Sequence, residues 1–322
     1  MPRRIDVCNG DADGLCAVVQ WRLAHPAQAE LVTGLKRDIE LLERVQAGPG
    51  DDVLVCDVSM QRNGAALRRL LAQGARVRYF DHHHPGEVPV HPHLQAHLDG
   101  DPRLCTSLLM DRFLQGRHRA WALVGAYGDN LGAEADRLAQ AGGWDATQRA
   151  VLRRLGEAIN YNAYGDTLAD VHLAPGELFE HMLGHADPLQ AWARDPVFAQ
   201  LHERRCADLE QGLRAPLRWE SAQAVVRELP DTPWSRRVVG VLANEMVLRD
   251  PARAQVVLQP RHGGYLVSLR APQGTAGGAD TLCRRFGGGG RAAAGGIDQL
   301  RDDQVPAFLA ALEQTDWQAP PV

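Results

Sequence analysis

Aspartates and a histidine pair follow three short apolar segments in the N-terminal half of this 322-residue sequence. They are Asp11 and Asp13 in NGDADG after IDVC, Asp57 after VLVC, and Asp81, His82 and His83 after VRYF. Carboxylates a few ångströms apart repel one another unless protons or cations neutralise them. Oxygen donors with one or two imidazoles suit Mn²⁺ or Mg²⁺ better than Zn²⁺. The pattern therefore predicts a divalent-metal site. In such a site Asp11 and Asp13 can each bind a different metal ion, and Asp57 can bridge the two. Paired metal ions are common in enzymes that catalyse phosphoryl chemistry.

The elements that must position these residues alternate between strands and helices. The apolar runs predict strands at 5–8, 53–56 and 77–80, and helical patterns fall at 15–23 and 65–71. Strands separated by helices at this spacing indicate βαβ units and a mostly parallel sheet. Ligands of an open α/β sheet bind outside the carboxyl ends of its strands, so we expect the aspartates and histidines to converge there.

Other roles for these residues are common. A single Asp at a strand end is usually a solvated turn residue or a helix cap, but three in succession favour a site. Six of the thirteen histidines lie between His82 and His97. We interpret His82 and His83 as functional because they follow a strand-terminal Asp. The others are interpreted as a solvated loop with adventitious metal affinity: His84, His91, His93 and His97.

Four motifs resemble those of the DHH phosphoesterase family in order and approximate spacing. They are Asp11-x-Asp13-Gly14, Asp57-Val58-Ser59, Asp81-His82-His83 and Gly128-Asp129-Asn130. In that family the aspartates and the first His hold two divalent metals, usually Mn²⁺, that activate water for attack on a phosphodiester or phosphoanhydride. The resemblance implies two Mn²⁺ sites, or Mg²⁺ in their place, with these ligands: Asp11, Asp13, Asp57, His82 and Asp129. It also implies that His83 faces the phosphate and that Asp81 orients the histidine pair.

One position departs from the family pattern. Relatives often have a His or an acidic residue just before the first motif, whereas this chain has Asn9 two positions before Asp11 and Val7 four before it. An Asn side chain offers a metal only a neutral carbonyl oxygen. Asn9 is therefore a further candidate ligand, and we expect the first metal to bind more weakly or to be completed by water or substrate.

The middle of the chain has a helical pattern from about residue 145 to 213. It begins with Asp145-Ala146-Thr147-Gln148, which has the spacing of a capping box. The segment 160–166 interrupts it and is either a solvated turn or part of the site wall. The charged stretch 202–210 predicts a connecting helix.

The C-terminal part differs in composition and contains a glycine-dense tract after its apolar runs. Apolar runs predict strands at 224–226, 238–242, 256–258 and 265–269, with a hairpin turn at 259–264 and a helix at 280–286. The glycine-dense tract 286–296 lacks the GK[ST] of a Walker loop. It resembles the signature of the DHH-associated substrate-binding domain, with Arg291 in place of the signature His, and 268–270 resembles another of that domain's elements. Glycines allow close backbone approach to phosphate and Arg can bind it bidentately, so we expect these substrate-binding residues: Arg270, Gly288, Gly289, Gly290 and Arg291.

The predicted fold class is α/β, with a larger parallel-sheet DHH domain and a smaller α/β DHHA1-type substrate-binding domain. We expect the metal-binding catalytic domain at 1–195, a connecting helix or linker at 196–218 and the substrate-binding domain at 219–322. The hydrophobic fraction of 45% and the charged fraction of 23% are typical of a globular protein. The six cysteines form no CxxC pair, which predicts reduced core thiols.

Charge and length restrict the expected substrate. The net charge is −5, whereas proteins that bind long duplex DNA through many phosphates usually have an excess of basic residues. The absence of an apolar run near 18 residues predicts no spanning helix or signal peptide, hence no membrane partner and a cytoplasmic location. The two-domain length resembles the subfamily that hydrolyses short linear nucleotides, namely nanoRNA, pGpG, pApA and sometimes pAp, to mononucleotides. The alternatives are a cyclic-dinucleotide phosphodiesterase, a pAp phosphatase and a non-catalytic nucleotide-binding regulator, and a homodimer is a candidate assembly.

Overall fold

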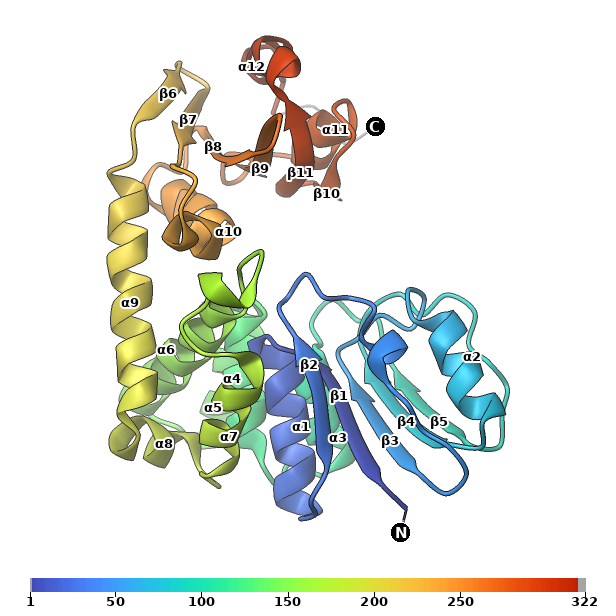
Figure 1. Ribbon diagram of the computed structural model, residues 1–322. Helices are drawn as coiled ribbons and strands as arrows, with labels where there is room; N and C mark the ends of the chain where they lie inside the picture. Colours follow the sequence, from blue (N-terminus) through green and yellow to red (C-terminus); the bar gives the residue numbers. More distant parts are fainter. Residues whose placement is uncertain (1, 318–322) are drawn as a thin grey trace. The chain divides into compact units, whose positions relative to one another are not determined.

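The computed structural model describes residues 2–317, which form two compact units, one ending at Arg204 and the other beginning at Arg205. The described part of the first unit contains an all-parallel five-stranded sheet of order β2-β1-β3-β4-β5 (Figure 1). Its strands are β1 Arg4–Asn9, β2 Glu30–Gly34, β3 Asp52–Cys56, β4 Arg76–Asp81 and β5 Leu94–Leu98. This arrangement confirms the predicted α/β class.

The sheet is covered on both faces because its inner strands are apolar on both sides. In β1, Val7 belongs to a core shared with α2 (Gly64–Ala72), whereas Cys8 belongs to a core shared with α1 (Ala12–Ala24). Successive strand residues point to opposite faces, so a fully buried parallel strand needs a continuous apolar run. The strands predicted at 5–8, 53–56 and 77–80 are β1, β3 and β4, and the one buried charge among them, Asp6, is paired with Arg22.

Among the described residues, seven further helices follow β5, the last of which, α9, begins in the first unit and ends in the second. They are α3 Thr106–Phe113, α4 Arg119–Gly128, α5 Gly132–Ala141, α6 Ala146–Asn162, α7 Pro175–Leu183, α8 Pro188–Arg194 and α9 Pro196–Leu213, with short 3₁₀ turns at Leu41–Arg44 and Leu168–Asp170. The predicted capping box starts α6: the Gln148 N–H donates to the Asp145 carboxylate at 2.8 Å, and the Asp145 N–H donates to the Gln148 side chain at 2.9 Å.

The C-terminal end of α4 packs closely against the N-terminal end of α1. A Cβ built on Gly128 would lie 2.3 Å from the Cβ of Ala12 and 2.9 Å from the carbonyl oxygen of Gly156. Only a glycine fits at such a distance. Gly128 precedes Asp129, and Ala12 lies between Asp11 and Asp13, so this contact brings the last motif to the first.

The described part of the second unit contains a mixed six-stranded sheet of order β10-β11-β9-β8-β7-β6, in which only β7 and β8 are parallel. Its strands are β6 Leu217–Glu220, β7 Ala224–Glu228, β8 Ala254–Arg261, β9 Gly264–Arg270, β10 Gly289–Arg291 and β11 Ala294–Arg301. Its helices are α10 Pro233–Arg249, α11 Ala279–Arg284 and α12 Val305–Glu313, with a 3₁₀ turn at Asp302–Gln304. The predicted hairpin joins β8 to β9 through Gly263, whose φ of 73° suits glycine.

The strand predicted at 238–242 is wrong, because these residues lie inside α10. Val238, Leu242 and Met246 are buried and recur every four residues, which is the period of one helix face. The short apolar run concealed that period. The predicted helix at 280–286 corresponds to α11, and the glycine tract forms the β10–β11 hairpin.

None of the helices in residues 2–317 is both long enough and apolar enough to span a membrane. Five cysteines are buried, as predicted: Cys8, Cys16, Cys56, Cys105 and Cys283. Cys206 is exposed on α9, so the prediction of a core thiol is wrong there.

Candidate metal centre

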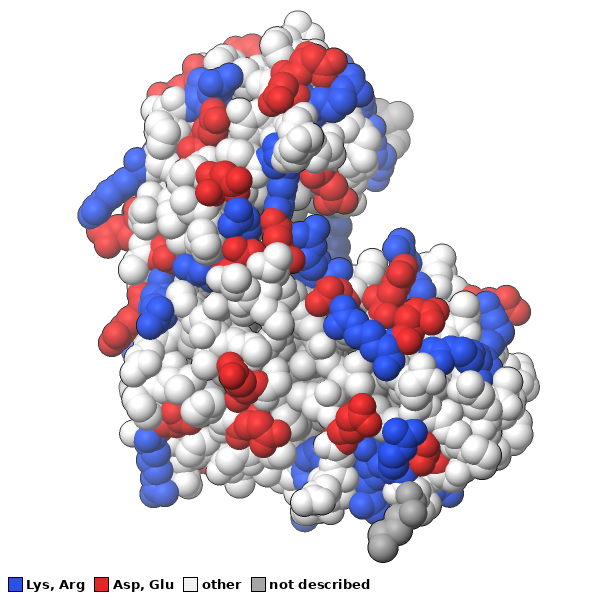
Figure 2. Space-filling model, in the orientation of Figure 1, with Lys and Arg blue, Asp and Glu red and all other residues white. Residues whose placement is uncertain are grey.

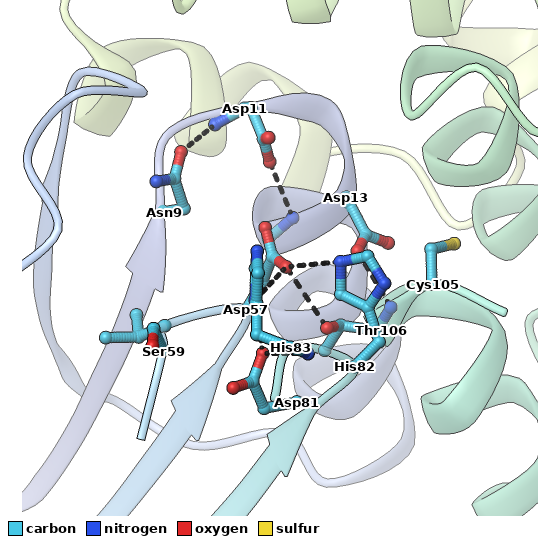
Figure 3. Close-up of polar contacts among 12 residues, drawn as sticks. Asn9, Asp11, Asp13, Asp57, Ser59, Asp81, His82, His83, Cys105 and Thr106 are labelled. Atoms are coloured by element: carbon cyan, nitrogen blue, oxygen red, sulfur yellow. Dashed lines mark hydrogen bonds and ion pairs between the residues drawn. The ribbon is translucent and has the colours of Figure 1, made fainter. Parts of the chain in front are cut away.

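The carboxyl ends of β1, β3 and β4 bring the first three motifs together (Figure 3). Asp11 is the N-cap of α1 directly after β1, Asp57 follows β3, and Asp81 is the last residue of β4. Asp129 arrives from the C-terminus of α4. The structure therefore places all four motifs at one edge of the sheet.

Asp13 is held by the start of another helix. Its two carboxylate oxygens accept the backbone N–H groups of Thr106 and Ser107, each at 2.7 Å, at the N-terminus of α3. The exposed N–H groups and the dipole of a helix N-terminus favour an anion. The hydroxyl of Thr106 also donates to Asp57 at 3.2 Å. Thr106 joins the site through this tertiary contact, and its only sequence signal is a small polar residue at a helix start.

Asp57 has a left-handed backbone, with a φ of 56°. Asp and Asn adopt this conformation more readily than other residues with side chains. The Asp57 N–H donates to the carbonyl oxygen of Phe80 at 3.0 Å, so the turn after β3 is fixed to β4. The turn holds the Asp57 carboxylate within 3.5 Å of His82 Nε2.

His82 presents one ring nitrogen to the site. Its Nδ1 lies 3.1 Å from the carbonyl oxygen of Leu104, an acceptor, so we assign the proton to Nδ1. This leaves the lone pair on Nε2, and such an outer partner commonly fixes the tautomer of a metal-binding His. Within the described residues, two groups have potential ligand atoms within 4.8 Å of one another: Asp13, His82 and Asp129, and Asp57, His82 and His83.

His83 is oriented by Asp81, which is fully buried. The Asp81 carboxylate lies 2.7 Å from His83 Nδ1 and accepts the His83 N–H at 3.2 Å. Its other oxygen accepts the Met60 N–H at 3.4 Å. The hydrogen bond to Asp81 raises the pKa of His83 above its ordinary value, which favours the charged imidazolium. The side chain of His83 is 48% exposed, so this charge is accessible to a ligand.

The carboxylates repel one another in the metal-free chain. Burial, followed by the charges of Asp11, Asp13 and Asp129, raises the pKa of Asp57 well above its ordinary value. Burial and Asp13 raise the pKa of Asp129 to about 7. A divalent cation would offset this repulsion, and a set of carboxylate oxygens with an imidazole nitrogen suits Mn²⁺ or Mg²⁺. The groups that fit such an ion are Asp13, Asp57, His82 and Asp129.

Asp11 has a different environment and is in neither of the two groups found among residues 2–317. One of its oxygens accepts the Gly14 N–H at 3.0 Å, and the other is paired with the ammonium of Lys36. Burial opposes ionisation, but the charge and hydrogen bond of Lys36 hold the pKa of Asp11 below its ordinary value. No motif in the sequence indicates Lys36, although it is the only lysine in a chain with 35 basic residues.

Asn9 binds backbone groups with both ends of its amide. Its oxygen accepts the Asp11 N–H at 3.2 Å, and its NH₂ donates to the carbonyl oxygen of Lys36 at 3.3 Å. The segment 160–166 also contacts Lys36: the Lys36 N–H donates to Ala163 at 3.0 Å, and Nζ lies 5.7 Å from the centre of the Tyr164 ring. This segment therefore forms a wall beside Lys36.

A cavity of about 170 Å³ opens among these groups. It is lined by Asn9, Asp11, Lys36, Asp38, Ile39, Asp57, Val58, Ser59, His82, His83 and Asp129. His97 lies away from it in β5 and stacks on Phe80 with ring centres 4.5 Å apart. The interpretation of His97 as part of a solvated loop is therefore wrong.

In the second unit, the candidate substrate-binding residues have unequal surroundings. Arg270 donates to Ser268 at 3.1 Å and to the carbonyl oxygen of Gly240 at 3.2 Å, so it ties β9 to α10. A Cβ on Gly288 would lie 2.1 Å from the carbonyl oxygen of Gly296, and Gly290 has a φ of 139°, so both glycines are needed by the hairpin. Gly289 has open space around it. Arg291 is exposed, and its side chain has no hydrogen-bond or ion-pair partner among the described residues.

No protein-family model matches the sequence, and no curated protein does. Among solved structures, the DHH domain of a member of a ribosomal-protein family matches with a TM-score of 0.68 and 14% identity over 99% of this chain and 88% of that one. The chain has the DHH-domain fold. Exonuclease RecJ bound to manganese matches this DHH fold with a TM-score of 0.61 and 21% identity over 98% of this chain and 91% of that one. The pGpG-specific phosphodiesterase PggH from Vibrio cholerae matches with a TM-score of 0.57 and 13% identity over 96% and 97%.

Proposed function

We propose that the chain is a metal-dependent phosphodiesterase of the DHH family that hydrolyses short linear nucleotides such as pGpG to mononucleotides. The observation that carries the proposal is the convergence of Asp13, Asp57, Asp129 and the His82 Nε2 atom at one sheet edge, with raised pKa values at Asp57 and Asp129. The fold likeness to a manganese-bound exonuclease and to a pGpG-specific phosphodiesterase supports it.

Each residue has a separate role in this proposal. Asp13, Asp57, His82 and Asp129 would hold a divalent cation, which supplies Lewis-acid polarisation of the phosphate and a nucleophile from water at neutral pH. His83, kept positively charged by Asp81, would donate a hydrogen bond to a phosphate oxygen. The N-terminus of α3 fixes Asp13, so the donor set is positioned before substrate arrives.

Two features favour a short substrate. The cavity of about 170 Å³ is small, and on the face shown in Figure 2 basic and acidic side chains are interspersed. Proteins that grip long duplex DNA instead use many clustered basic contacts to phosphate. We propose Arg291, assisted by the β10–β11 hairpin, as a contact for a substrate phosphate, since its guanidinium is exposed and unpaired among the described residues.

The proposal is tested by incubating the chain with Mn²⁺ or Mg²⁺ and a panel of pGpG, pApA, longer oligonucleotides, cyclic dinucleotides and pAp. We expect Mn²⁺-dependent release of mononucleotides from the linear dinucleotides, with Mn²⁺ superior to Mg²⁺. Asp57→Asn keeps a residue suited to the left-handed backbone and removes the charge, so it should abolish turnover in a folded protein.

The other outcomes of the panel identify the alternatives. Preferred cleavage of cyclic dinucleotides or of pAp would assign a different substrate to the same centre. Nucleotide binding without turnover would indicate a regulator. Undiminished turnover after exhaustive chelation would contradict the metal-dependent mechanism. Arg291→Ala should raise KM for pGpG more than for the same dinucleotide without its 5′-phosphate, and equal losses would exclude a contact to that phosphate.

A further inference from the structure

We propose that the ammonium group of Lys36 replaces one of the two cations expected at this centre, so that the chain binds a single divalent cation. The inference rests on the proposed function, because it concerns the same site. The centre then has two unlike halves, one neutralised by a residue of the chain and the other by a metal.

The half around Asp11 already has its positive charge. One Asp11 oxygen accepts the Gly14 N–H, and the other is paired with the Lys36 ammonium. A divalent cation beside Asp11 would have to displace this ammonium or be repelled by it, since like charges repel. Asn9 adds no negative charge, so it does not offset that repulsion as a carboxylate at the same position would.

The position of Lys36 is fixed by its backbone. Its carbonyl oxygen accepts from the side chain of Asn9 at 3.3 Å, and its N–H donates to Ala163 at 3.0 Å. The ring of Tyr164 lies 5.7 Å from Nζ, within the range of a cation–π contact. Asn9 therefore acts as a positioning residue for Lys36, which accounts for an amide at the place of a ligand.

The residue type at position 36 supports this role, because lysine resembles a metal ion more closely than arginine does. The chain contains 35 basic residues, and Lys36 is the only lysine among them. Arginine carries its charge on a planar fork of five donors, whereas lysine carries it on a compact ammonium. A compact charge is the closer substitute for a metal ion between carboxylates. This single lysine lies in the wall of the cavity that holds the carboxylates.

Among the described residues, no lysine or arginine is hydrogen-bonded or ion-paired to Asp13 or Asp129, although the charge of Lys36 acts on Asp129. Asp13, Asp129 and the Nε2 atom of His82 lie within 4.8 Å of one another. Asp57 contacts the half around Asp13 through His82, whose Nε2 lies 3.5 Å from its carboxylate, and the charges of Asp11 and Asp13 both act on it. The donor set that remains for a metal is therefore the one containing His82.

The test is the number of Mn²⁺ ions bound per chain, measured by calorimetric titration and by elemental analysis after desalting. We expect one ion in the wild type. Asn9→His/Lys36→Met removes the ammonium and adds a ligand, so it should bind two. Asn9→His with Lys36 retained, and the matched Asn9→His/Lys36→Arg variant with its charge kept, should still bind one.

A second measurement uses the wild type alone, in case the double variant fails to fold. Because Lys36 is the only lysine, protein labelled with ¹⁵N-lysine gives one side-chain ammonium signal. We expect that signal in the metal-free chain and after saturation with diamagnetic Mg²⁺. Its loss on addition of Mg²⁺ would show that the cation displaces Lys36, and would overturn the inference.

The outcomes separate the inference from the proposed function. Two Mn²⁺ ions in the wild type, or one in a folded Asn9→His/Lys36→Met variant, would overturn the role of Lys36 and leave a metal-dependent phosphodiesterase intact. No bound Mn²⁺ in the folded wild type would overturn both. One ion in the wild type and two in the double variant would support the inference whatever substrate is cleaved.

Discussion

Replacing Asp129 by Asn should stabilise the metal-free chain and weaken its response to metal. Burial and Asp13 raise the pKa of Asp129 from 3.8 to about 7. An acid with a raised pKa in the folded state destabilises that state once it must ionise, and one pKa unit is worth about 1.4 kcal/mol. Ionised Asp129 therefore costs the folded chain about 4 kcal/mol at pH 8. Burying an amide in its place costs about 1–3 kcal/mol, so we expect a net gain of about 2 kcal/mol.

The sign of the effect depends on pH and metal. Below about pH 4, Asp129 is protonated in both states, so only the amide cost of about 1–3 kcal/mol remains and the variant should be less stable than wild type; its relative stability should rise between about pH 4 and pH 7 and stay constant above. With Mn²⁺ at 100 times its Kd, the wild type gains about 2.7 kcal/mol. A variant whose Kd is raised 100-fold gains only about 0.4 kcal/mol at the same concentration. The difference in free energy of unfolding between Asp129→Asn and wild type should therefore shrink or change sign when metal is added.

The assay is urea unfolding of wild type and Asp129→Asn at pH 4 and pH 8, with chelator or with Mn²⁺. Asp298→Asn is the matched control, because Asp298 is exposed on β11 and its replacement should change stability by less than about 0.5 kcal/mol. A metal-free Asp129→Asn variant less stable than wild type at pH 8 would refute the argument that like charges strain this site. An unchanged response to Mn²⁺ would refute the assignment of Asp129 as a ligand.

Three further predictions concern packing, the histidine pair and pH. Gly128→Ala should destabilise the chain by about 1–3 kcal/mol in urea unfolding, because the new Cβ would lie 2.3 Å from that of Ala12; unchanged stability would contradict this packing. Asp81→Asn should lower the pKa of His83 measured by NMR, since the hydrogen bond to Asp81 raises it; an unchanged titration would contradict that cause. Calorimetry should find Mn²⁺ affinity rising between pH 6 and pH 8, because Asp129 must release a proton of pKa about 7; a flat profile would exclude that coupling.

The inner strands could be predicted from the sequence and the edge strands could not. β1, β3 and β4 lie inside the sheet and are mostly buried, so each appears as a short, mainly apolar run, broken only by Asp6 in β1 and Arg78 in β4. The edge strands β2 and β5, ELVTG and LQAHL, are only partly buried and mix polar with apolar residues. Their pairing depends on neighbours far along the chain, which no local pattern contains.

The residues of the candidate site also fall into two groups, those that could be predicted from the sequence and those that could not. Residues at the ends of the inner strands could be found from the sequence, because the position of a parallel strand's end is implied by its apolar run. Thr106 could not, since its contact to Asp57 depends on α3 docking against Asp13. Lys36 follows the edge strand β2, and it reaches Asp11 only because β2 pairs beside β1.

The electrostatics of the metal-free chain connect these observations. The pKa values of Asp57 and Asp129 are raised, whereas that of Asp11 is lowered; the Lys36 charge acts on all three carboxyls, but only Asp11 also accepts a hydrogen bond from its ammonium. A chain that needed two removable cations would gain nothing from neutralising one half in advance. A chain that carries one positive charge of its own keeps that half assembled at any metal concentration, and loses only the other half to chelation. Metal removal should therefore leave Asp11 and Lys36 paired, with the electrostatic cost of ionisation falling on Asp57 and Asp129.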